Sequence, residues 1–362
     1  MTTSVTIDSV TKRFGDTTAV DAVSFDIAKG EFFTLLGSSG CGKTTLLRMI
    51  AGFMRQTSGH IRFGGKVIDH VPPHQRNTGM VFQNYAIFPH LTVFDNIAYG
   101  LRARRRGKAE IEREVKRMLE LVRLGHLAHR RPRELSGGQQ QRVVLARAMV
   151  IQPDVLLMDE PLSNLDTEMR MHLRAEIRSL QRQVGVTTIY VTHDQEEALL
   201  MSDRIAVMSR GRVEQLDVPH RIYAEPQTLF VAGFIGENNL LPGTVLGREA
   251  DGGAIIELAG GGRLRGASTT TGDGRACIVS IRPQDIDIAD ASNGTELSLS
   301  GTVGDIQFLG GAVKLMVDIG ADKPLTVALP GRRDMAMPTL GSALRLSVPP
   351  HAVRTFQPEV GA

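Results

Sequence analysis

The 362-residue sequence predicts a mixed α/β domain with a mostly parallel sheet, followed by a smaller all-β domain. Short apolar runs at 32–36 and 155–158 are typical of strands buried on both faces, and helical stretches separate them. After about residue 236, short strand-like runs between glycine clusters, such as those at 254–258 and 313–319, predict a small barrel or sandwich. Two domains also suit a chain of this length.

The composition is that of a globular protein from a reducing compartment. Hydrophobic residues make up 42% of the chain, charged residues 22%, and the net charge is only +3. Two cysteines, Cys41 and Cys277, are too few for a disulfide framework. The start of the chain lacks a signal-peptide pattern, and no apolar run reaches the roughly 18–20 residues that span a bilayer. We therefore expect a cytoplasmic chain whose membrane role would run through a partner.

The elements of the first domain follow in a regular order. Alternating apolar residues around the turn at Gly15 predict two half-buried strands, and the buried run at 32–36 leads into a helix that stops near Gly52. Four more buried strands are expected, at 80–82, 155–158, 188–191 and 205–208. Amphipathic helices are expected at 111–122 and 169–180. The polar residues that close the strands should meet at their carboxyl edge: Gln83, Glu160 and His193.

Residues 37–45 read Gly-Ser-Ser-Gly-Cys-Gly-Lys-Thr-Thr and match the phosphate-loop pattern, between a buried strand and a helix. Backbone N–H groups and the positive end of the helix should bind nucleotide phosphates. Lys43 should reach the β- and γ-phosphates, and Thr44 should hold Mg²⁺. A tight turn without a ligand is the alternative, and this context disfavours it. The expected nucleotide-binding residues of the loop are Gly37, Ser38, Ser39, Gly40, Cys41, Gly42, Lys43, Thr44 and Thr45.

Asp159 and Glu160 end the apolar strand at 155–158. Asp159 is placed to bind Mg²⁺, directly or through water, and Glu160 to act as the general base on the attacking water. Such a pair can also cap a following helix, so the catalytic interpretation depends on the presence of the phosphate loop in the same chain. Within that loop, Cys41 is either a reactive thiol that nucleotide shields or a small filler, and both interpretations remain open.

Residues 135–139, Leu-Ser-Gly-Gly-Gln, form a glycine turn that opens a helix and complete a set of motifs. In chain order the set comprises the phosphate loop, Gln83, residues 135–139, Asp159-Glu160-Pro161, Ser163-Asn164-Leu165-Asp166 and His193. Over about residues 4–235 the chain thereby resembles the ATPase subunit of an ABC transporter. The resemblance implies a P-loop NTPase domain over residues 1–236, with a RecA-like core, an antiparallel β subdomain and a helical subdomain at about 88–154.

The resemblance also implies a homodimer in which two chains pack head to tail and hold two ATP molecules with Mg²⁺. The signature turn, residues 135–139, would complete the site of the other chain through Ser136, Gly137, Gly138 and Gln139. Asp166 would organise that contact. Phe14 matches the aromatic residue that stacks on adenine, with a core phenylalanine of a β-hairpin as the alternative.

In this family the reaction depends on four residues, which here would be Lys43, Gln83, Glu160 and His193. Gln83 would sense Mg²⁺ and the attacking water, so that the metal residues would be Thr44, Gln83 and Asp159. His193 would hydrogen-bond the γ-phosphate and position Glu160. A structural histidine is the more common case for an isolated residue, but Thr192-His193-Asp194 matches the family pattern.

The segment after Gln83 borders, in importers of this type, the groove that receives a helix of the membrane subunit. Tyr85, Ile87 and Phe88 are therefore candidate contacts, although each could equally pack inside the helical subdomain. The resemblance places the ATPase at the cytoplasmic face of the inner membrane, beside transmembrane permease subunits and, indirectly, a solute-binding protein. The basic run at 102–108 lacks interleaved aromatic residues, so we expect a solvated turn and no nucleic-acid partner.

Residues 237–362 resemble the TOBE domain, an OB-like β barrel found behind importer ATPases, most clearly at 281–286 and 301–303. We expect this domain to stabilise the dimer or to regulate it. With it, the chain resembles the polyamine, ferric-iron and sugar importer branch, and the stretches 75–85 and 236–239 favour a spermidine/putrescine-type member. Import of ferric iron, a phosphonate or a sugar remains an alternative, as do a soluble ABC ATPase acting on nucleic acid and a regulatory binding module.

Overall fold

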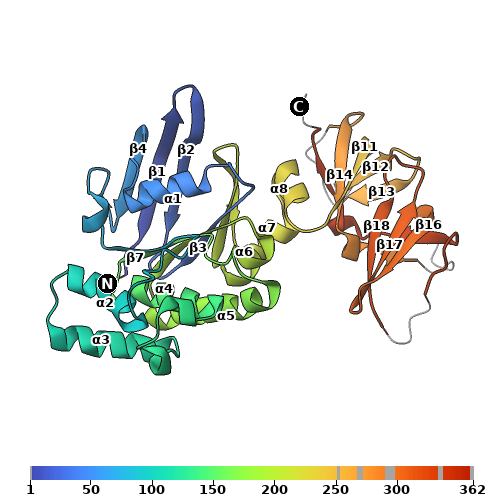
Figure 1. Ribbon diagram of the computed structural model, residues 1–362. Helices are drawn as coiled ribbons and strands as arrows, with labels where there is room; N and C mark the ends of the chain where they lie inside the picture. Colours follow the sequence, from blue (N-terminus) through green and yellow to red (C-terminus); the bar gives the residue numbers. More distant parts are fainter. Residues whose placement is uncertain (1, 251–252, 267–271, 290–297, 333–336, 359–362) are drawn as a thin grey trace. The chain divides into compact units, whose positions relative to one another are not determined.

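The computed structural model describes residues 2–250, 253–266, 272–289, 298–332 and 337–358. The chain divides into two compact units, Met1–Glu225 and Pro226–Ala362 (Figure 1). This division lies ahead of the domain boundary predicted at residue 236. Helix α8 (Leu229–Phe234) belongs to the second unit because Asn238 Nδ2 donates to Ala232 O at 2.8 Å, and the Arg282 guanidinium donates to Ile235 O.

A six-stranded sheet forms the centre of the first unit, in the order β10-β9-β3-β8-β7-β6. Neighbouring strands run parallel except β10, which is antiparallel to β9, and this confirms the predicted mostly parallel sheet. β3, β7 and β8 are buried along their whole length, as expected for strands covered on both faces. The strands are β3 (Phe32–Leu36), β6 (Thr78–Val81), β7 (Val155–Asp159), β8 (Thr187–Thr192), β9 (Arg204–Ser209) and β10 (Arg212–Asp217).

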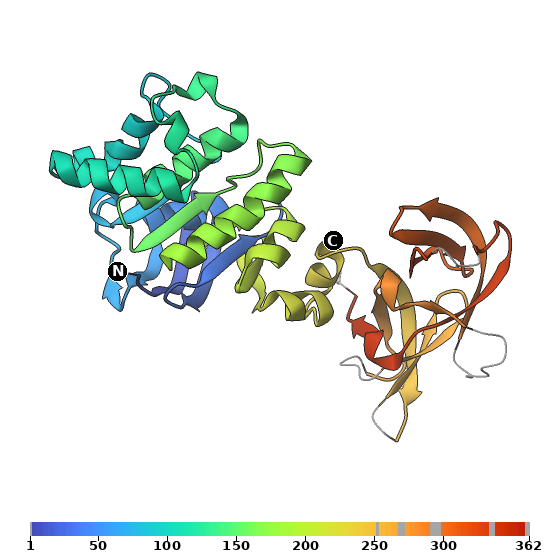
Figure 2. The same cartoon turned by 90° about the horizontal axis from the view of Figure 1, so that it is seen from below.

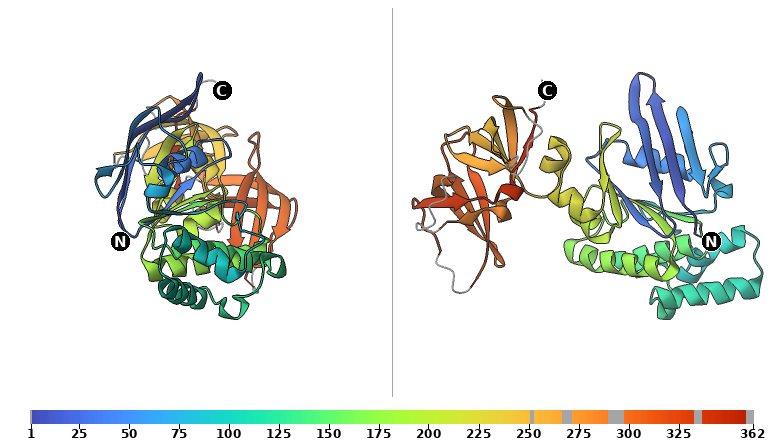
Figure 3. Two further views of the ribbon diagram at one scale, coloured as in Figure 1. Left: turned by 60° about the vertical axis from the view of Figure 1, so that its left-hand side comes forward. Right: turned by 180° about the vertical axis from the view of Figure 1, so that it is seen from behind.

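An antiparallel sheet of order β2-β1-β4-β5 covers one side of the central sheet (Figure 3, right). Helix α1 (Lys43–Ala51) shares one hydrophobic core with both sheets, because Leu46, Leu47 and Ile50 pack among residues of each. Gly52 ends the helix in the left-handed conformation, where glycine carries no steric cost. The strands of this sheet are β1 (Val5–Phe14), β2 (Thr17–Ile27), β4 (Ser58–Phe63) and β5 (Lys66–Val67).

A layer of helices covers the other side of the central sheet (Figure 2). Phe32 and Phe33 show the division, since they point to opposite faces of β3 and belong to different hydrophobic cores. No helix among the described residues is long and apolar enough to cross a membrane. The helices are α2 (Val93–Ala103), α3 (Lys108–Leu121), α4 (Gly137–Met149), α5 (Thr167–Val184), α6 (Gln195–Met201) and α7 (Pro219–Ala224), with 3₁₀ turns η1 (Pro73–Gln75), η2 (Gly125–Leu127) and η3 (Pro132–Glu134).

The second unit consists of two five-stranded antiparallel sheets around one hydrophobic core, which confirms the predicted all-β fold. Their orders are β13-β12-β11-β14-β20 and β15-β19-β16-β17-β18. The first sheet comprises β11 (Asn239–Arg248), β12 (Ala254–Leu258), β13 (Arg263–Gly266), β14 (Ala276–Ile281) and β20 (Arg354–Phe356). The second comprises β15 (Asp287–Ile288), β16 (Leu299–Phe308), β17 (Ala312–Asp318), β18 (Leu325–Pro330) and β19 (Ala343–Ser347), and the 3₁₀ turns are η4 (Pro283–Asp285) and η5 (Pro350–Ala352).

Candidate functional site

The phosphate loop, residues 37–45, connects the carboxyl end of β3 to the first turn of α1. A Cβ atom on Gly37 would lie 2.3 Å from Met208 O, so the backbone passes there with no room for a side chain. Gly42 has φ 106°, and its Cβ would lie 2.4 Å from Ala19 O. Both positions therefore require glycine. No side chain caps α1, which leaves its first N–H groups available to an anion.

The Lys43 ammonium lies inside this loop. Its Nζ donates to Gly37 O at 2.7 Å and to Ser38 O at 2.8 Å, and it lies 3.7 Å from Cys41 Sγ. Ser38, Ser39 and Gly40 are exposed, and Thr45 is half-buried. Cys41 is only 4% exposed, and such burial is what the filler interpretation of this thiol requires.

Thr44 and Asp159 join the phosphate loop to the end of β7. Thr44 Oγ1 donates to Asp159 Oδ1 at 3.1 Å. Burial raises the pKa of Asp159, while the Thr44 hydrogen bond and the positive charges of Arg48 and Lys43 act in the opposite direction. A hydroxyl and a carboxylate are suitable oxygen ligands for Mg²⁺, which usually binds one or two carboxylates together with phosphate and water. The described residues contain no cluster of three His, Cys, Asp or Glu side chains placed for a metal.

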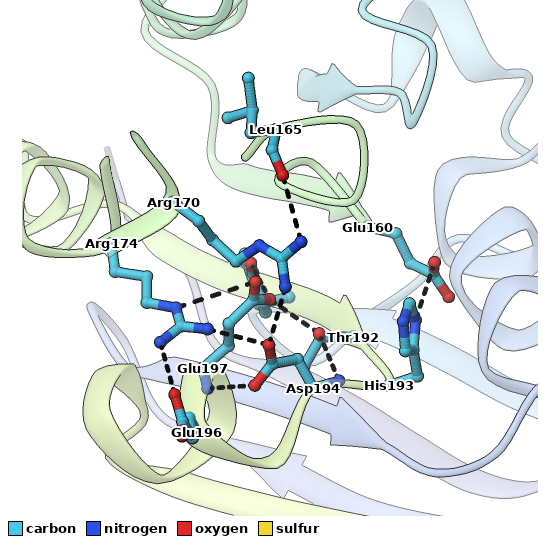
Figure 4. A network of polar contacts seen from close by, with 10 residues as sticks. Glu160, Leu165, Arg170, Arg174, Thr192, His193, Asp194, Glu196 and Glu197 are labelled. Carbon is cyan, nitrogen blue, oxygen red and sulfur yellow. Dashed lines mark hydrogen bonds and ion pairs between the residues drawn. The ribbon is translucent and has the colours of Figure 1, made fainter. Parts of the chain in front are cut away.

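Gln83, Glu160 and His193 meet beside this pair, although they come from three separate strand ends. Glu160 Oε2 lies 3.1 Å from His193 Nδ1 (Figure 4). Gln83 Nε2 donates to the same oxygen at 3.4 Å. Glu160 has φ 43°, a left-handed conformation that is disfavoured for a residue with a Cβ. Strain of this kind is common where a side chain must be aimed at a site. The His193 side chain is 54% exposed, so it can reach a ligand.

A partly buried network that the sequence did not predict lies behind His193 (Figure 4). Asp194 caps α6 by accepting from Glu197 N at 3.1 Å. Its second carboxylate oxygen accepts from Arg174 Nη2 at 2.8 Å and from Arg170 Nη1 at 3.3 Å. Arg170 also donates to Leu165 O at 3.2 Å. The four-residue spacing of the two arginines places them on one face of α5, which is the only signal of this network in the local sequence.

The signature turn begins α4. Ser136 Oγ accepts from Gln139 N at 3.3 Å, and Gln139 Oε1 accepts from Ser136 N at 3.0 Å, which together form a capping box. A Cβ on Gly137 would lie 3.3 Å from Leu165 Cδ2, and one on Gly138 would lie 3.0 Å from Met169 Sδ. The signature turn therefore packs closely against the start of α5.

Asp166 stands at that start, where it caps α5 by accepting from Met169 N at 2.9 Å. None of the hydrogen bonds among the described residues joins residues 136–139 or Asp166 to the phosphate loop.

The remaining predicted residues are aromatic or aliphatic. Phe14 ends β1 and is 48% exposed, unlike a core phenylalanine, and Lys12 Nζ lies 5.0 Å from its ring centroid. Tyr85 and Ile87 are half-buried and pack against the helical core. The Phe88 ring is also half-buried, with its centroid 4.5 Å from that of Tyr99.

Comparisons with known proteins agree with this geometry. A family model described as ABC transporter matches residues 20–163, and a TOBE domain model matches residues 279–356. The spermidine/putrescine import ATP-binding protein of Thermobifida fusca is 46% identical, covering 89% of this chain and 85% of the relative. The Fe(3+) ions import ATP-binding protein of Fusobacterium nucleatum is 43% identical, covering 98% and 94%. The sn-glycerol-3-phosphate import ATP-binding protein of Ruegeria sp. is 41% identical, covering 99% and 98%.

Among solved structures, the chain resembles cbiO1 of Clostridium perfringens, part of the ABC transporter complex cbiONQ. The TM-score is 0.57 at 29% identity, over 61% of this chain and 90% of cbiO1. The full-length relatives, the two domain matches and the fold all agree. The chain therefore belongs to the ATP-binding subunits of ABC importers that carry a C-terminal TOBE domain, which couple ATP hydrolysis to import.

Proposed function

We propose that this ATPase subunit drives import of a polyamine of the spermidine/putrescine type, through ATP-driven closure of a homodimer. The observation that supports the ATP chemistry best is the convergence of Gln83, Glu160 and His193 beside the Thr44–Asp159 pair. Five side chains from three strand ends and one loop thereby lie near one another at the carboxyl edge of the central sheet. This is where open α/β sheets bind their ligands.

Each residue then has a defined task. Lys43 and the N–H groups at the start of α1 bind the β- and γ-phosphates. Thr44, Asp159 and Gln83 would hold Mg²⁺, which when bound would supply positive charge against the charge that develops on the phosphates. Glu160 accepts the proton of the attacking water, and His193 keeps the Glu160 carboxylate oriented while it hydrogen-bonds the γ-phosphate. Phe14, with its exposed ring, stacks on the adenine.

A second chain completes each site. Ser136 and the N–H groups of Gly137 and Gly138 stand at the start of a helix, which favours an anion, and no hydrogen bond among the described residues joins them to the phosphate loop. They bind the γ-phosphate held by the partner, and Asp166 orders that contact. ATP thus closes the dimer, and hydrolysis releases it.

The partners on the membrane side are permease subunits, supplied with solute by a binding protein. Tyr85, Ile87 and Phe88 contact the permease at the cytoplasmic face of the membrane, although Tyr85 and Ile87 also pack against the helical core. The polyamine assignment is supported by the relatives from Thermobifida fusca and Rubrobacter xylanophilus, 46% and 48% identical, which are named for spermidine/putrescine import. Relatives named for Fe(3+) ions and for sn-glycerol-3-phosphate have similar identity, so these solutes are the alternatives.

The Glu160→Gln variant tests the catalytic assignment. We expect it to bind ATP normally, to lose hydrolysis by about 10²–10⁴-fold, the usual contribution of a general base, and to accumulate as an ATP-bound dimer. Nucleotide binding, phosphate release and size-exclusion chromatography measure these three properties. Glu112→Gln, an exposed glutamate on α3, is the matched control and should behave as wild type. Hydrolysis within a few-fold of wild type in Glu160→Gln would contradict the general-base role.

Solute uptake tests the polyamine assignment separately. The subunit is purified from membranes together with its permease, reconstituted with the binding protein, and supplied with labelled putrescine, spermidine, Fe³⁺ or glycerol 3-phosphate. We expect uptake of a polyamine that depends on ATP and is lost in Glu160→Gln. Uptake of another solute, with polyamines ignored, would overturn the substrate assignment and leave the ATPase assignment intact.

A further inference from the structure

Arg147 connects the far end of the signature helix to the segment that follows Gln83. α4 begins at the signature turn, and Arg147 lies in its last turn, about 15 Å further along the helix axis. The Arg147 guanidinium donates to Ala86 O at 2.8 Å and to Tyr85 O at 3.2 Å. Its Cζ also lies 4.9 Å from the centroid of the Phe88 ring. One side chain thus contacts three of four consecutive residues.

The backbone of this segment adopts a conformation that its residues disfavour. Tyr85 has φ 58° and Ala86 has φ 46°, so two successive residues with a Cβ are in the left-handed region. Such a turn persists only where surrounding contacts favour it. The two carbonyl groups that Arg147 binds belong to these two residues. Backbone hydrogen bonds also close the turn, because Tyr85 N donates to Phe82 O at 3.0 Å and Ala86 N donates to Asn84 O at 2.5 Å. The guanidinium holds the two carbonyl groups of the turn.

The segment is anchored on both sides of this turn. On one side, the fully buried Asn96 accepts from Phe88 N at 2.9 Å and donates to Phe88 O at 3.1 Å. On the other side, Gln83 O accepts from Asn164 Nδ2 at 3.0 Å, and Gln83 Nε2 reaches Glu160. The strained turn is thus the link between an anchor in the helical layer and an anchor in the catalytic cluster.

We propose that Arg147 is a positioning residue that couples the position of the signature helix to Gln83 and to the permease-facing residues 85–88. A shift of α4 moves the guanidinium, and the guanidinium moves the two carbonyl groups it binds. The coupling rests on the proposed function, since Gln83 acts on the attacking water only if the site hydrolyses ATP. Lysine cannot replace the planar fork of arginine, which binds two acceptors at once.

Hydrogen exchange of the full chain without nucleotide tests the clamp directly. In Arg147→Ala we expect the amides of residues 83–88 to exchange about tenfold faster or more, because the strained turn loses two charge-assisted hydrogen bonds. Arg147→Lys should fall between this variant and wild type, and it serves as the second variant if Arg147→Ala folds poorly. The phosphate loop should exchange as in wild type.

Arg104→Ala is the matched control. Arg104 also binds a backbone carbonyl from the end of a helix, donating to Ile151 O at 3.0 Å and to Asn77 Oδ1 at 2.8 Å, but neither bond involves residues 83–88. We expect Arg104→Ala to leave exchange at 83–88 unchanged. An unchanged 83–88 segment in both Arg147 variants, or an equal effect of Arg104→Ala, would overturn the proposal.

A rescue experiment distinguishes positioning from simple stabilisation of the helical layer. Glycine occupies the left-handed region without steric cost, so Ala86→Gly should reduce the need for the clamp. We expect Arg147→Ala to lower kcat of ATP hydrolysis about tenfold with KM for ATP within about twofold, and the added Ala86→Gly change to restore part of that loss. No recovery in the double variant would contradict the positioning role.

The two proposals can fail independently. If wild type and Glu160→Gln hydrolyse ATP equally, the catalytic assignment is wrong, yet exchange at 83–88 in the nucleotide-free chain still decides whether Arg147 holds the turn. If hydrolysis behaves as proposed but exchange at 83–88 does not depend on Arg147, only the coupling is wrong.

Discussion

At the scale of single residues, Asp159 places a carboxyl group at a buried position, where folding disfavours the ionised form. The residue is 7% exposed, and burial is the largest influence on its pKa, which is raised. A carboxyl group whose pKa is higher in the folded chain than in the unfolded chain lowers stability once it ionises. This loss of stability is absent at pH values below the ordinary pKa of the carboxyl group. It appears as the pH rises toward and past the raised pKa of the folded chain, and it persists at neutral pH.

Asp159→Asn should therefore melt at a higher temperature than wild type at pH 7 in the absence of nucleotide, and at the same temperature at about pH 3, below the ordinary pKa of an aspartate. A gain of about 1 kcal/mol in the free energy of unfolding would appear as about 2–4 °C. Calorimetry at the two pH values measures the difference. Asp16→Asn, at an exposed turn position, is the control and should show no such pH dependence. A lower melting temperature of Asp159→Asn at pH 7 would mean that Asp159 stabilises the fold.

At the scale of elements, α1 depends on a residue that is distant in the sequence. Arg76 is 5% exposed, and its Nη1 donates to Met49 O and to Ile50 O, both at 2.8 Å. These are carbonyl groups of the last turn of α1, which carry the negative end of the helix dipole. A Cβ on Gly52 would lie 2.5 Å from Arg76 Nε, so the guanidinium packs directly against the end of the helix. The helix that carries Lys43 is thus fixed at its C-terminus by Arg76.

We expect Arg76→Met to lower the free energy of unfolding by about 2–4 kcal/mol, because it removes two charge-assisted hydrogen bonds. Met49 O retains Gly52 N as a donor, but no backbone donor among the described residues replaces Arg76 at Ile50 O. Urea denaturation of the full chain measures the change through the midpoint of the first transition. The exposed Arg55→Met is the control, with an expected effect within about 0.5 kcal/mol. If both variants unfold at the same urea concentration, Arg76 does not hold the helix.

The elements of the first unit show which features the sequence could predict and which it could not. The buried apolar runs predicted the strands β3, β7, β8 and β9, and Gly52 predicted the end of α1. Each of these signals lies within a few neighbouring residues of the sequence. The strand predicted at 80–82 was one residue too long at its end, since β6 stops at Val81 and Phe82 is 37% exposed. Arg76, which is buried, and Arg147 and Arg170, which are half-buried, were missed as anchors. Their partners lie far away in the sequence or on loops, and an isolated arginine is normally a surface residue.

At the scale of the whole molecule, the proposed sharing of each ATP site between two chains has a consequence for activity. Lys43 belongs to the phosphate loop and Ser136 to the signature turn, and none of the described hydrogen bonds joins these segments. If each site takes its loop from one chain and its signature turn from the other, a chain that lacks one segment can still supply the other segment to a partner. A two-fold dimer then contains two such sites.

A mixture of Lys43→Ala and Ser136→Ala chains tests this arrangement. Each variant alone should be nearly inactive, because both sites of its dimer are damaged. With random pairing, about half of the dimers are mixed and each contains one intact site, so activity should recover to about a quarter of wild type if the sites act independently. ATP hydrolysis measured against the mixing ratio should be greatest near equal amounts, and activity that never exceeds the sum of the separate variants would contradict shared sites.

The Ser136→Ala variant also removes a helix cap, so its loss of activity needs a matched control. Thr92→Ala provides one, because Thr92 Oγ1 caps α2 by accepting from Asp95 N at 3.1 Å, in the same way that Ser136 caps α4. Each substitution should cost about 1 kcal/mol of stability. Only Ser136→Ala should abolish hydrolysis, and only that variant should be complemented by Lys43→Ala. Equal loss of hydrolysis in Thr92→Ala would show that Ser136 acts through the stability of its helix rather than through the ATP of the neighbouring chain.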